Sequence, residues 1–307
     1  MELCLHLGVH RTGTTAFQKA CRAQSASLAA EGVVVWPPKA MRSPHRSSFV
    51  ELVRRSETEA EAARLVDETV WAVRDEMADL KAQGIRRLLV SEENLVGPMD
   101  LNFKTQMLYP KIRTRLQAYA QMFQVAPTYV FINIRDYASY WASSFAFVSL
   151  RKTLPLFHKI KFDIVNEPRG WIDVIADASA CFPMSKFVVG SYSKSHQDAV
   201  SWAKTMLGLP PNHSFSLPDR PANAAFSAAA LAKAAELSAQ DPNLTVPELR
   251  QAVRDVNEQG AAPFQPFTDH ELEMLSARYD ADIGSIETGE LSAVSLFRPD
   301  KTQANAV

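Results

Sequence analysis

The segment GVHRTGTT at residues 8–15 has the residue types of a loop that binds a phosphate or sulfate group. Gly8 and Gly13 have the spacing of the glycines in a mononucleotide-binding loop, although Thr14 occupies the position of its lysine. The nearest cation is Arg11, inside the loop. Helix N-terminal N–H groups, threonine hydroxyls and an arginine together suit an anion. We predict that the anion is bound by Arg11, Thr12, Gly13, Thr14 and Thr15.

A second basic position follows the apolar run TYVFINI, where Arg135 begins a helical pattern. Ser139 and Ser143 lie four and eight residues further along, which is one and two turns on the same helix face. We expect Arg135 and Ser143 to bind a second phosphate. The alternative is a solvated arginine at the end of a strand.

The two segments together resemble the donor-binding motifs of sulfotransferases. LGVHRTGTTAFQ is similar to their 5′-phosphosulfate loop, usually P-K-[ST]-G-T-T, and IRDYASYWASSF is similar to their 3′-phosphate motif. The resemblance is nearest to bacterial sulfotransferase-like proteins and covers residues 3–210 in the order of elements. It implies 3′-phosphoadenosine 5′-phosphosulfate (PAPS) as donor, adenosine 3′,5′-bisphosphate (PAP) as product and no metal. Arg11 replaces the family's lysine and keeps the positive charge.

The resemblance also suggests residues for catalysis and for the adenine. In the family the general base is a His or Glu just beyond a central strand, and SEEN at residues 91–94 resembles the S-S-E-N of bacterial relatives. We favour Glu93 as the base, with Glu92 as the alternative, unless both are solvated residues or carboxylates that cap a helix. His10, within the loop, is a competing base. Tyr192 has the position of a tyrosine that contacts the adenine, although an aromatic side chain packed on the core is equally compatible.

The acceptor implied by the family is a hydroxyl or amine of a carbohydrate or small molecule. MRSPHRSSF at residues 41–49 and LRKTLPLFHKIKF at residues 150–162 are candidate acceptor segments. The second segment has a basic rim that suits an anionic saccharide, unless it is simply a solvated surface; the rim residues are Arg151, Lys152, His158, Lys159 and Lys161. The resemblance also implies that Arg220 and Asn223 fold back over the donor, as a late Arg-containing loop does in the family.

Alternating strand and helix patterns position these motifs. Strands are expected at residues 3–7, 32–38, 85–94, 128–136 and 186–192, and helices at 14–32, at 111–123 and from the Ser56–Glu59 capping box to Gly84. This order predicts an α/β fold, a P-loop-type three-layer sandwich with a mostly parallel central sheet flanked by helices.

The last part of the chain has helical patterns and no strand pattern. The helical stretches are residues 223–240, 245–260 and 269–284. We expect a PAPS-binding core at residues 1–222 and, at residues 223–307, a helical C-terminal section packed on that core rather than an independent domain.

Composition limits the function classes. The chain has 33 Lys and Arg against 34 Asp and Glu among 307 residues, so no overall basic field favours a nucleic acid or an anionic membrane. No apolar run is long enough to span a membrane, and three scattered cysteines suggest reduced thiols. We expect a cytoplasmic enzyme; its oligomeric state does not follow from the sequence.

Two other function classes remain open. An unusual P-loop kinase would require ATP and magnesium, and no Walker-B aspartate is evident at the end of an apolar strand. A catalytically inactive relative would bind a nucleotide or a glycan without turnover.

Overall fold

The computed structural model describes residues 1–42, 59–152, 154–193, 195–218, 226–258 and 262–299. Six parallel strands form one sheet in the order β2-β3-β1-β4-β5-β6. The strands are β1 (Glu2–His6), β2 (Val33–Trp36), β3 (Arg87–Ser91), β4 (Tyr129–Ile134), β5 (Lys186–Ser191) and β6 (Val294–Leu296). The predicted α/β fold with a parallel sheet is confirmed.

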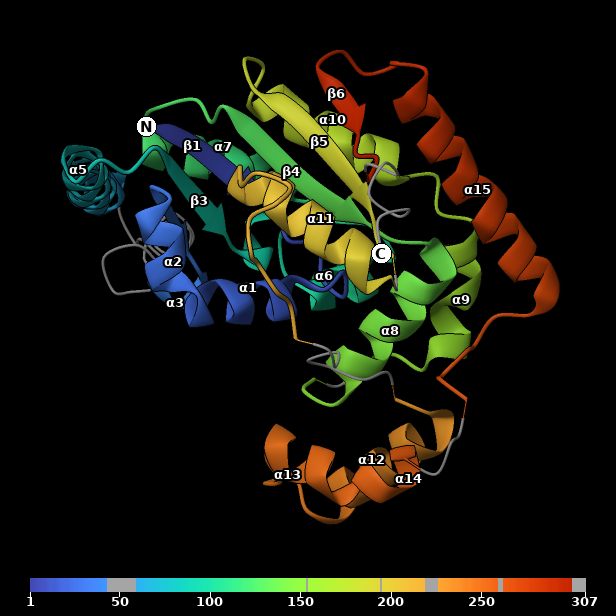
Figure 1. Cartoon of the computed structure of the whole chain (residues 1–307). Helices are drawn as coiled ribbons and strands as arrows, with labels where there is room; N and C mark the ends of the chain where they lie inside the picture. Colours follow the sequence, from blue (N-terminus) through green and yellow to red (C-terminus); the bar gives the residue numbers. More distant parts are fainter. Residues whose placement is uncertain (43–58, 153, 194, 219–225, 259–261, 300–307) are drawn as a thin grey trace.

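Helices cover both faces of this sheet, as the three-layer prediction requires (Figure 1). One face packs on α1 (Thr14–Ala23), α2 (Ser25–Ala30) and α11 (His196–Leu207). The other packs on α5 (Glu59–Ala82), α7 (Ile112–Phe123) and α10 (Trp171–Cys181). Alternate residues of β1 supply the two cores: Cys4 belongs to the first, and Leu3 and Leu5 to the second.

The strand order brings the predicted motifs to one edge of the sheet. Parallel strands end at the same edge, and β3, β1, β4 and β5 are consecutive neighbours. The chain leaves β1 toward β2 and leaves β4 toward β5, in opposite directions across the sheet. In open α/β sheets, ligands bind at the carboxyl ends of two strands whose connections diverge in this way.

Further helices lie in the connections that follow the carboxyl ends of β2, β3 and β4. They are α3 (Pro38–Met41), η1 (Glu93–Leu95), α6 (Met99–Thr105), α8 (Tyr137–Ser149) and α9 (Phe157–Val165). Asp136 caps α8 by accepting a hydrogen bond from the Ser139 N–H, so the helix starts at Tyr137, two residues after Arg135.

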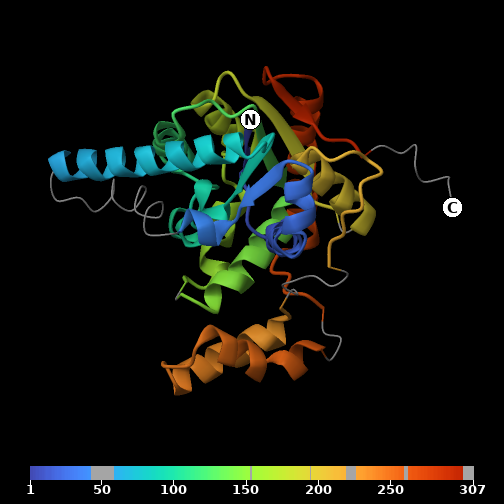
Figure 2. The same ribbon diagram turned by 60° about the vertical axis from the view of Figure 1, so that its left-hand side comes forward.

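The C-terminal section has two parts. The long helix α15 (Asp269–Glu287) packs on the core, where Asp282 accepts hydrogen bonds from the Tyr137 hydroxyl and the Trp171 N–H. The helices α12 (Ala228–Gln240), α13 (Val246–Ala252) and α14 (Arg254–Glu258) form a smaller cluster around Leu150. Figures 1 and 2 both show these three helices beyond the end of α8.

The strand β6 was not predicted from the sequence; it follows the three helical stretches and adds to the sheet edge beside β5. Its three residues are too few to show a period, and its pairing partner lies about a hundred residues earlier. The helix expected at residues 14–32 is divided into α1 and α2. The predicted boundary between the core at residues 1–222 and the C-terminal section at residues 223–307 lies outside the described residues, so this division stays a prediction. The predicted cap at Ser56 also lies outside them. Among the helices described, none has the length and apolarity needed to cross a bilayer.

Candidate functional site

The loop between β1 and α1 has the backbone of an anion cradle. A Cβ on Gly8 would lie 2.6 Å from Thr14 Cγ2, so only glycine allows this close approach. Gly13 has a φ of +90° and is the N-cap of α1. The first helical hydrogen bonds run from Ala16 and Phe17 to the Gly13 carbonyl, so the N–H groups of Thr14 and Thr15 precede them and suit an anion.

The three threonines of the loop differ in their contacts. Thr12 Oγ1 donates to the Val9 carbonyl at 2.6 Å, and the Thr12 carbonyl accepts from Asn133 Nδ2 of β4, so Thr12 shapes the loop. Thr14 is buried, and its Oγ1 has no hydrogen-bond partner among the described residues. Thr15 is exposed. A buried hydroxyl without a partner is costly, so Thr14 is the side chain in this loop most in need of a ligand.

Arg11 links the loop to α8. Its φ is +68°, and its Nε donates to Ser143 Oγ at 2.8 Å. Burial lowers its pKa to about 10, and the nearby positive charges of Arg135 and Arg250 add to this effect. A bound anion would stabilise the charged form of a guanidinium that is both buried and close to like charges.

Arg135, after β4, contacts the same loop. Its Nη1 donates to the Arg11 carbonyl at 2.7 Å, and its Nε donates to Ser139 Oγ at 2.9 Å. Its hydroxyl partner in this structure is therefore Ser139, whereas the predicted partner Ser143 binds Arg11. Burial lowers the pKa of Arg135. Tyr192, directly after β5, lies with its ring centroid 4.8 Å from Arg135 Cζ, so three strand ends meet at this point.

The Glu92 side chain is buried and serves as a helix cap and ion-pair partner. It is buried and caps η1 by accepting from the Asn94 N–H at 2.8 Å. Arg42 donates to both of its carboxylate oxygens, at 2.7 and 3.0 Å. Burial raises the pKa of Glu92, and the Arg42 contact opposes that rise. The arrangement fits the capping alternative for this residue.

Glu93 is the more accessible carboxylate, with its side chain 26% exposed. It accepts hydrogen bonds from Gln18 Nε2 at 3.2 Å and from Arg42 Nη2 at 3.1 Å. Burial tends to raise its pKa, but the hydrogen bonds from its own backbone N–H and from Gln18, with the charge of Arg42, lower the pKa below its usual value. Glu93 is therefore ionised at neutral pH and near the loop.

His10 contacts the hydroxyl of a buried tyrosine, Tyr109. Its Nδ1 lies 3.0 Å from the Tyr109 hydroxyl, which also accepts from the Tyr140 hydroxyl at 2.9 Å. Burial lowers the pKa of His10 to about 4, so the ring is neutral at pH 7. The chain of hydroxyls continues to Asn102 Nδ2. His10 is thus engaged in a buried network; because a neutral imidazole can accept a proton, it stays the competing base.

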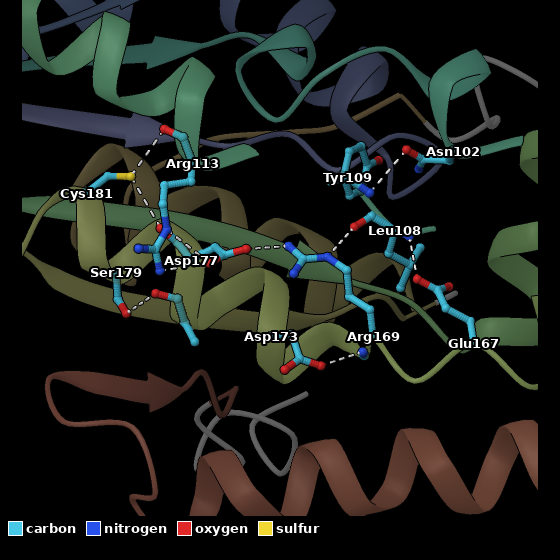
Figure 3. A network of polar contacts seen from close by, with 12 residues as sticks. Asn102, Leu108, Tyr109, Arg113, Glu167, Arg169, Asp173, Asp177, Ser179 and Cys181 are labelled. Atoms are coloured by element: carbon cyan, nitrogen blue, oxygen red, sulfur yellow. Dashed lines mark hydrogen bonds and ion pairs between the residues drawn. The ribbon is translucent and has the colours of Figure 1, made fainter. Parts of the chain in front are cut away.

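A brace of polar contacts fixes the segment that carries Tyr109 (Figure 3). The Tyr109 N–H donates to Asn102 Oδ1, the Leu108 N–H donates to Glu167, and the Leu108 carbonyl accepts from Arg169 Nε at 2.6 Å. This brace holds Tyr109 at a φ of +44°, which non-glycine residues rarely adopt. Burial raises the pKa of Glu167 to about 7, and its Oε2 has no partner among the described residues.

The sequence reasoning missed Gln18, Arg42 and Tyr109 as parts of this site. Gln18 lies four residues after Thr14 on α1, so helical spacing could have placed it on the face toward the loop. Arg42 lies in the segment considered for the acceptor. Nothing in the local sequence marks Tyr109, because its contact with His10 joins residues 99 positions apart.

The basic segment after α8 is partly neutralised. Lys152 forms an ion pair with Asp100 at 2.6 Å, and Lys161 forms one with Glu271 at 2.9 Å. Arg151 instead stacks on Phe147, with its Cζ 3.6 Å from the ring centroid. His158 and Lys159 are exposed. Arg220, Asn223 and most of the 41–49 segment lie outside the described residues.

Comparison with known proteins adds no assignment. No protein-family model matches this chain, and no curated protein matches it significantly. In the described part of the chain, no three His, Cys, Asp or Glu side chains are grouped as a metal site would require. The functional argument therefore depends on the geometry of the site.

Proposed function

We propose that this protein transfers a sulfuryl group from PAPS to a hydroxyl or amine of an acceptor. The observation that carries the proposal is the meeting of Arg11 and Arg135 at the carboxyl edge of the sheet, next to a loop whose buried Thr14 hydroxyl has no hydrogen-bond partner among the described residues. Two cations from neighbouring strand ends suit a nucleotide with two separated phosphates. A single triphosphate would more typically require the lysine that this loop lacks.

Each part of the donor has residues suited to it. The N–H groups at the start of α1, with Thr14 and Thr15, suit the 5′-phosphosulfate. Arg135, Ser139 and Ser143 suit the 3′-phosphate. Tyr192 lies against this site, where a Cβ on Gly13 would be 3.9 Å from its Cε2, and its ring suits an adenine.

The proposed chemistry is a single in-line displacement at sulfur. The acceptor oxygen or nitrogen forms a bond to sulfur while the bond from sulfur to the 5′-phosphate oxygen breaks, and Glu93 takes the acceptor's proton. Arg11 and the loop N–H groups stabilise the charge that develops on the leaving phosphate. We prefer Glu93 to Glu92 because both oxygens of Glu92 are bound by Arg42 and its side chain is only 2% exposed.

Ligand-induced stabilisation tests the donor assignment. PAP without any divalent metal should raise the melting temperature of the protein, because a ligand at 100 times its Kd adds about 2.7 kcal/mol of stability. Arg11→Ala should reduce this rise. Stabilisation by ATP with magnesium but not by PAP would favour the kinase alternative and contradict the proposal. PAP binding without turnover over a broad acceptor screen would favour the inactive relative.

A further inference from the structure

Three arginines gather around one aromatic ring beside the proposed donor site. The Cζ atoms of Arg151, Arg11 and Arg250 lie 3.6, 5.1 and 5.5 Å from the centroid of Phe147. They come from the end of α8, the β1–α1 loop and α13. The ring face attracts each cation, but the three positive charges repel one another.

No acidic side chain compensates this cluster in the described part of the chain. The ion pairs found there involve other residues, and none includes Arg11, Arg151 or Arg250. Burial, with the charge of Arg250, lowers the pKa of Arg151 to about 10. Arg250 Nε is buried and has no hydrogen-bond partner among the described residues. By contrast, the buried Arg87 pairs with Glu2 at 2.7 Å.

A cavity of about 440 Å³ opens at Arg151 and Arg250, between the end of α8 and α13. Its lining residues are Arg151, Val246, Pro247, Arg250, Gln251 and Arg254. The volume lies within the range of small-ligand sites. Arg11 belongs to the β1–α1 loop and shares the Phe147 ring with Arg151 and Arg250, which line the cavity, so the cavity and the proposed donor loop meet at this ring.

We propose that this cavity binds an anionic group of the acceptor, a carboxylate or sulfate of an acidic saccharide. The assignment of the anion to an acceptor rests on the proposed function. The donor's two phosphates already have the α1 N-terminus and Arg135, so the remaining positive charge at Arg151 and Arg250 is available for a third anion. Planar guanidinium forks match carboxylate and sulfate oxygens and fix the orientation of the bound group.

The experiment is calorimetric titration of the whole chain, with PAP present, using a heparin-derived tetrasaccharide as the acidic probe and maltotetraose as the neutral one. The wild type should bind the acidic probe with an affinity that falls with salt, and it should not bind the neutral one. Arg250→Gln and Arg151→Gln should each weaken acidic binding by about tenfold or more. Arg74→Gln removes the same charge from α5, where Arg74 stacks on Trp71, and should bind like the wild type.

The outcomes separate this inference from the proposed function. Unchanged tetrasaccharide affinity in both variants overturns the inference even if PAP binds. A loss of PAP affinity in both variants, equal to that of Arg135→Gln, also overturns it, because the cluster would then serve the donor. If PAP does not bind but the tetrasaccharide still requires Arg250, the anion site stands and the sulfotransferase proposal fails. Arg151 is exposed, so its variant decides the matter if Arg250→Gln does not fold.

Discussion

The hydroxyls of Thr12 and Thr14 offer a matched test of the anion cradle. Thr14→Val removes a buried hydroxyl that has no hydrogen-bond partner in the described part of the chain, so we expect it to leave stability unchanged or higher and to weaken PAP binding. Thr12→Val removes the hydrogen bond to the Val9 carbonyl and should lower the free energy of unfolding by about 1 kcal/mol. Denaturant unfolding and PAP titration of both variants check this. A large stability loss in Thr14→Val would show that its hydroxyl is structural.

The assignment of the base is tested by replacing each carboxylate with its amide. Glu93→Gln should keep donor affinity and lower turnover by about 10²- to 10⁴-fold, the usual range for general-base catalysis. Glu92→Gln should instead lower stability, because the paired contact with Arg42 is weakened. The measurements are single-turnover rates with an acceptor found by screening, and thermal unfolding. If Glu93→Gln reacts at the wild-type rate while His10→Ala or Glu92→Gln is inactive but folded, the base is misassigned.

The functional residues at strand ends were easier to predict from the sequence than the residues that contact them. Arg11, Arg135 and Tyr192 follow apolar runs, and parallel strands bring such positions to one edge. Their exact partners depend on side-chain packing: Arg135 contacts Ser139 although the spacing equally allowed Ser143. Gln18 and Arg42 reach Glu93 from other elements, a placement that only the tertiary structure determines.

At the scale of elements, the link between α9 and α10 braces the segment before α7, and this brace should be sensitive to pH. Burial raises the folded-state pKa of Glu167 to about 7, from a usual 4.5. The surrounding charges are Arg278, Arg169 and Asp173. Because the folded state favours the protonated acid, this contribution to stability is complete below pH 4.5 and is lost as the pH rises through 7.

Glu167→Gln removes this titration and keeps an oxygen that can accept from the Leu108 N–H. Relative to the wild type, the variant should gain stability as the pH rises from 4.5 to 8, by at most about 3 kcal/mol. Denaturant unfolding at several pH values measures the difference. Glu290→Gln, which removes an exposed carboxyl, is the control. A pH-independent difference for Glu167→Gln, or one of opposite slope, would contradict the assignment.

Element existence was easier to predict than element order. The run Leu3–Leu7 and the spacing in α7 contain enough residues to show a strand and a helix. The order of the strands in the sheet could not be predicted in this way, because the insertion of β1 between β3 and β4 depends on crossovers that no local pattern records. β6 was missed because its three residues acquire their strand conformation by pairing with β5.

At the scale of the whole molecule, the sheet order produces the site. The strands β3, β1, β4 and β5 are neighbours and lead into Glu92 and Glu93, the Arg11 loop, Arg135 and Tyr192, so groups distant in sequence lie at one edge of the sheet. Arg250, from α13, adds a further positive charge near Arg11. The central claim is that this edge of the sheet recognises two separated phosphates on one nucleotide.

The most direct measurement compares PAP with adenosine 5′-phosphate, which lacks the 3′-phosphate, by calorimetric titration without divalent metal. The wild type should bind PAP more tightly. Arg135→Gln should lose about tenfold or more of its PAP affinity, while its affinity for adenosine 5′-phosphate stays near that of the wild type. Arg113→Gln, which breaks a surface pair with Asp177, should change neither affinity. Equal losses for the two nucleotides in Arg135→Gln, or no preference for PAP in the wild type, would contradict the account.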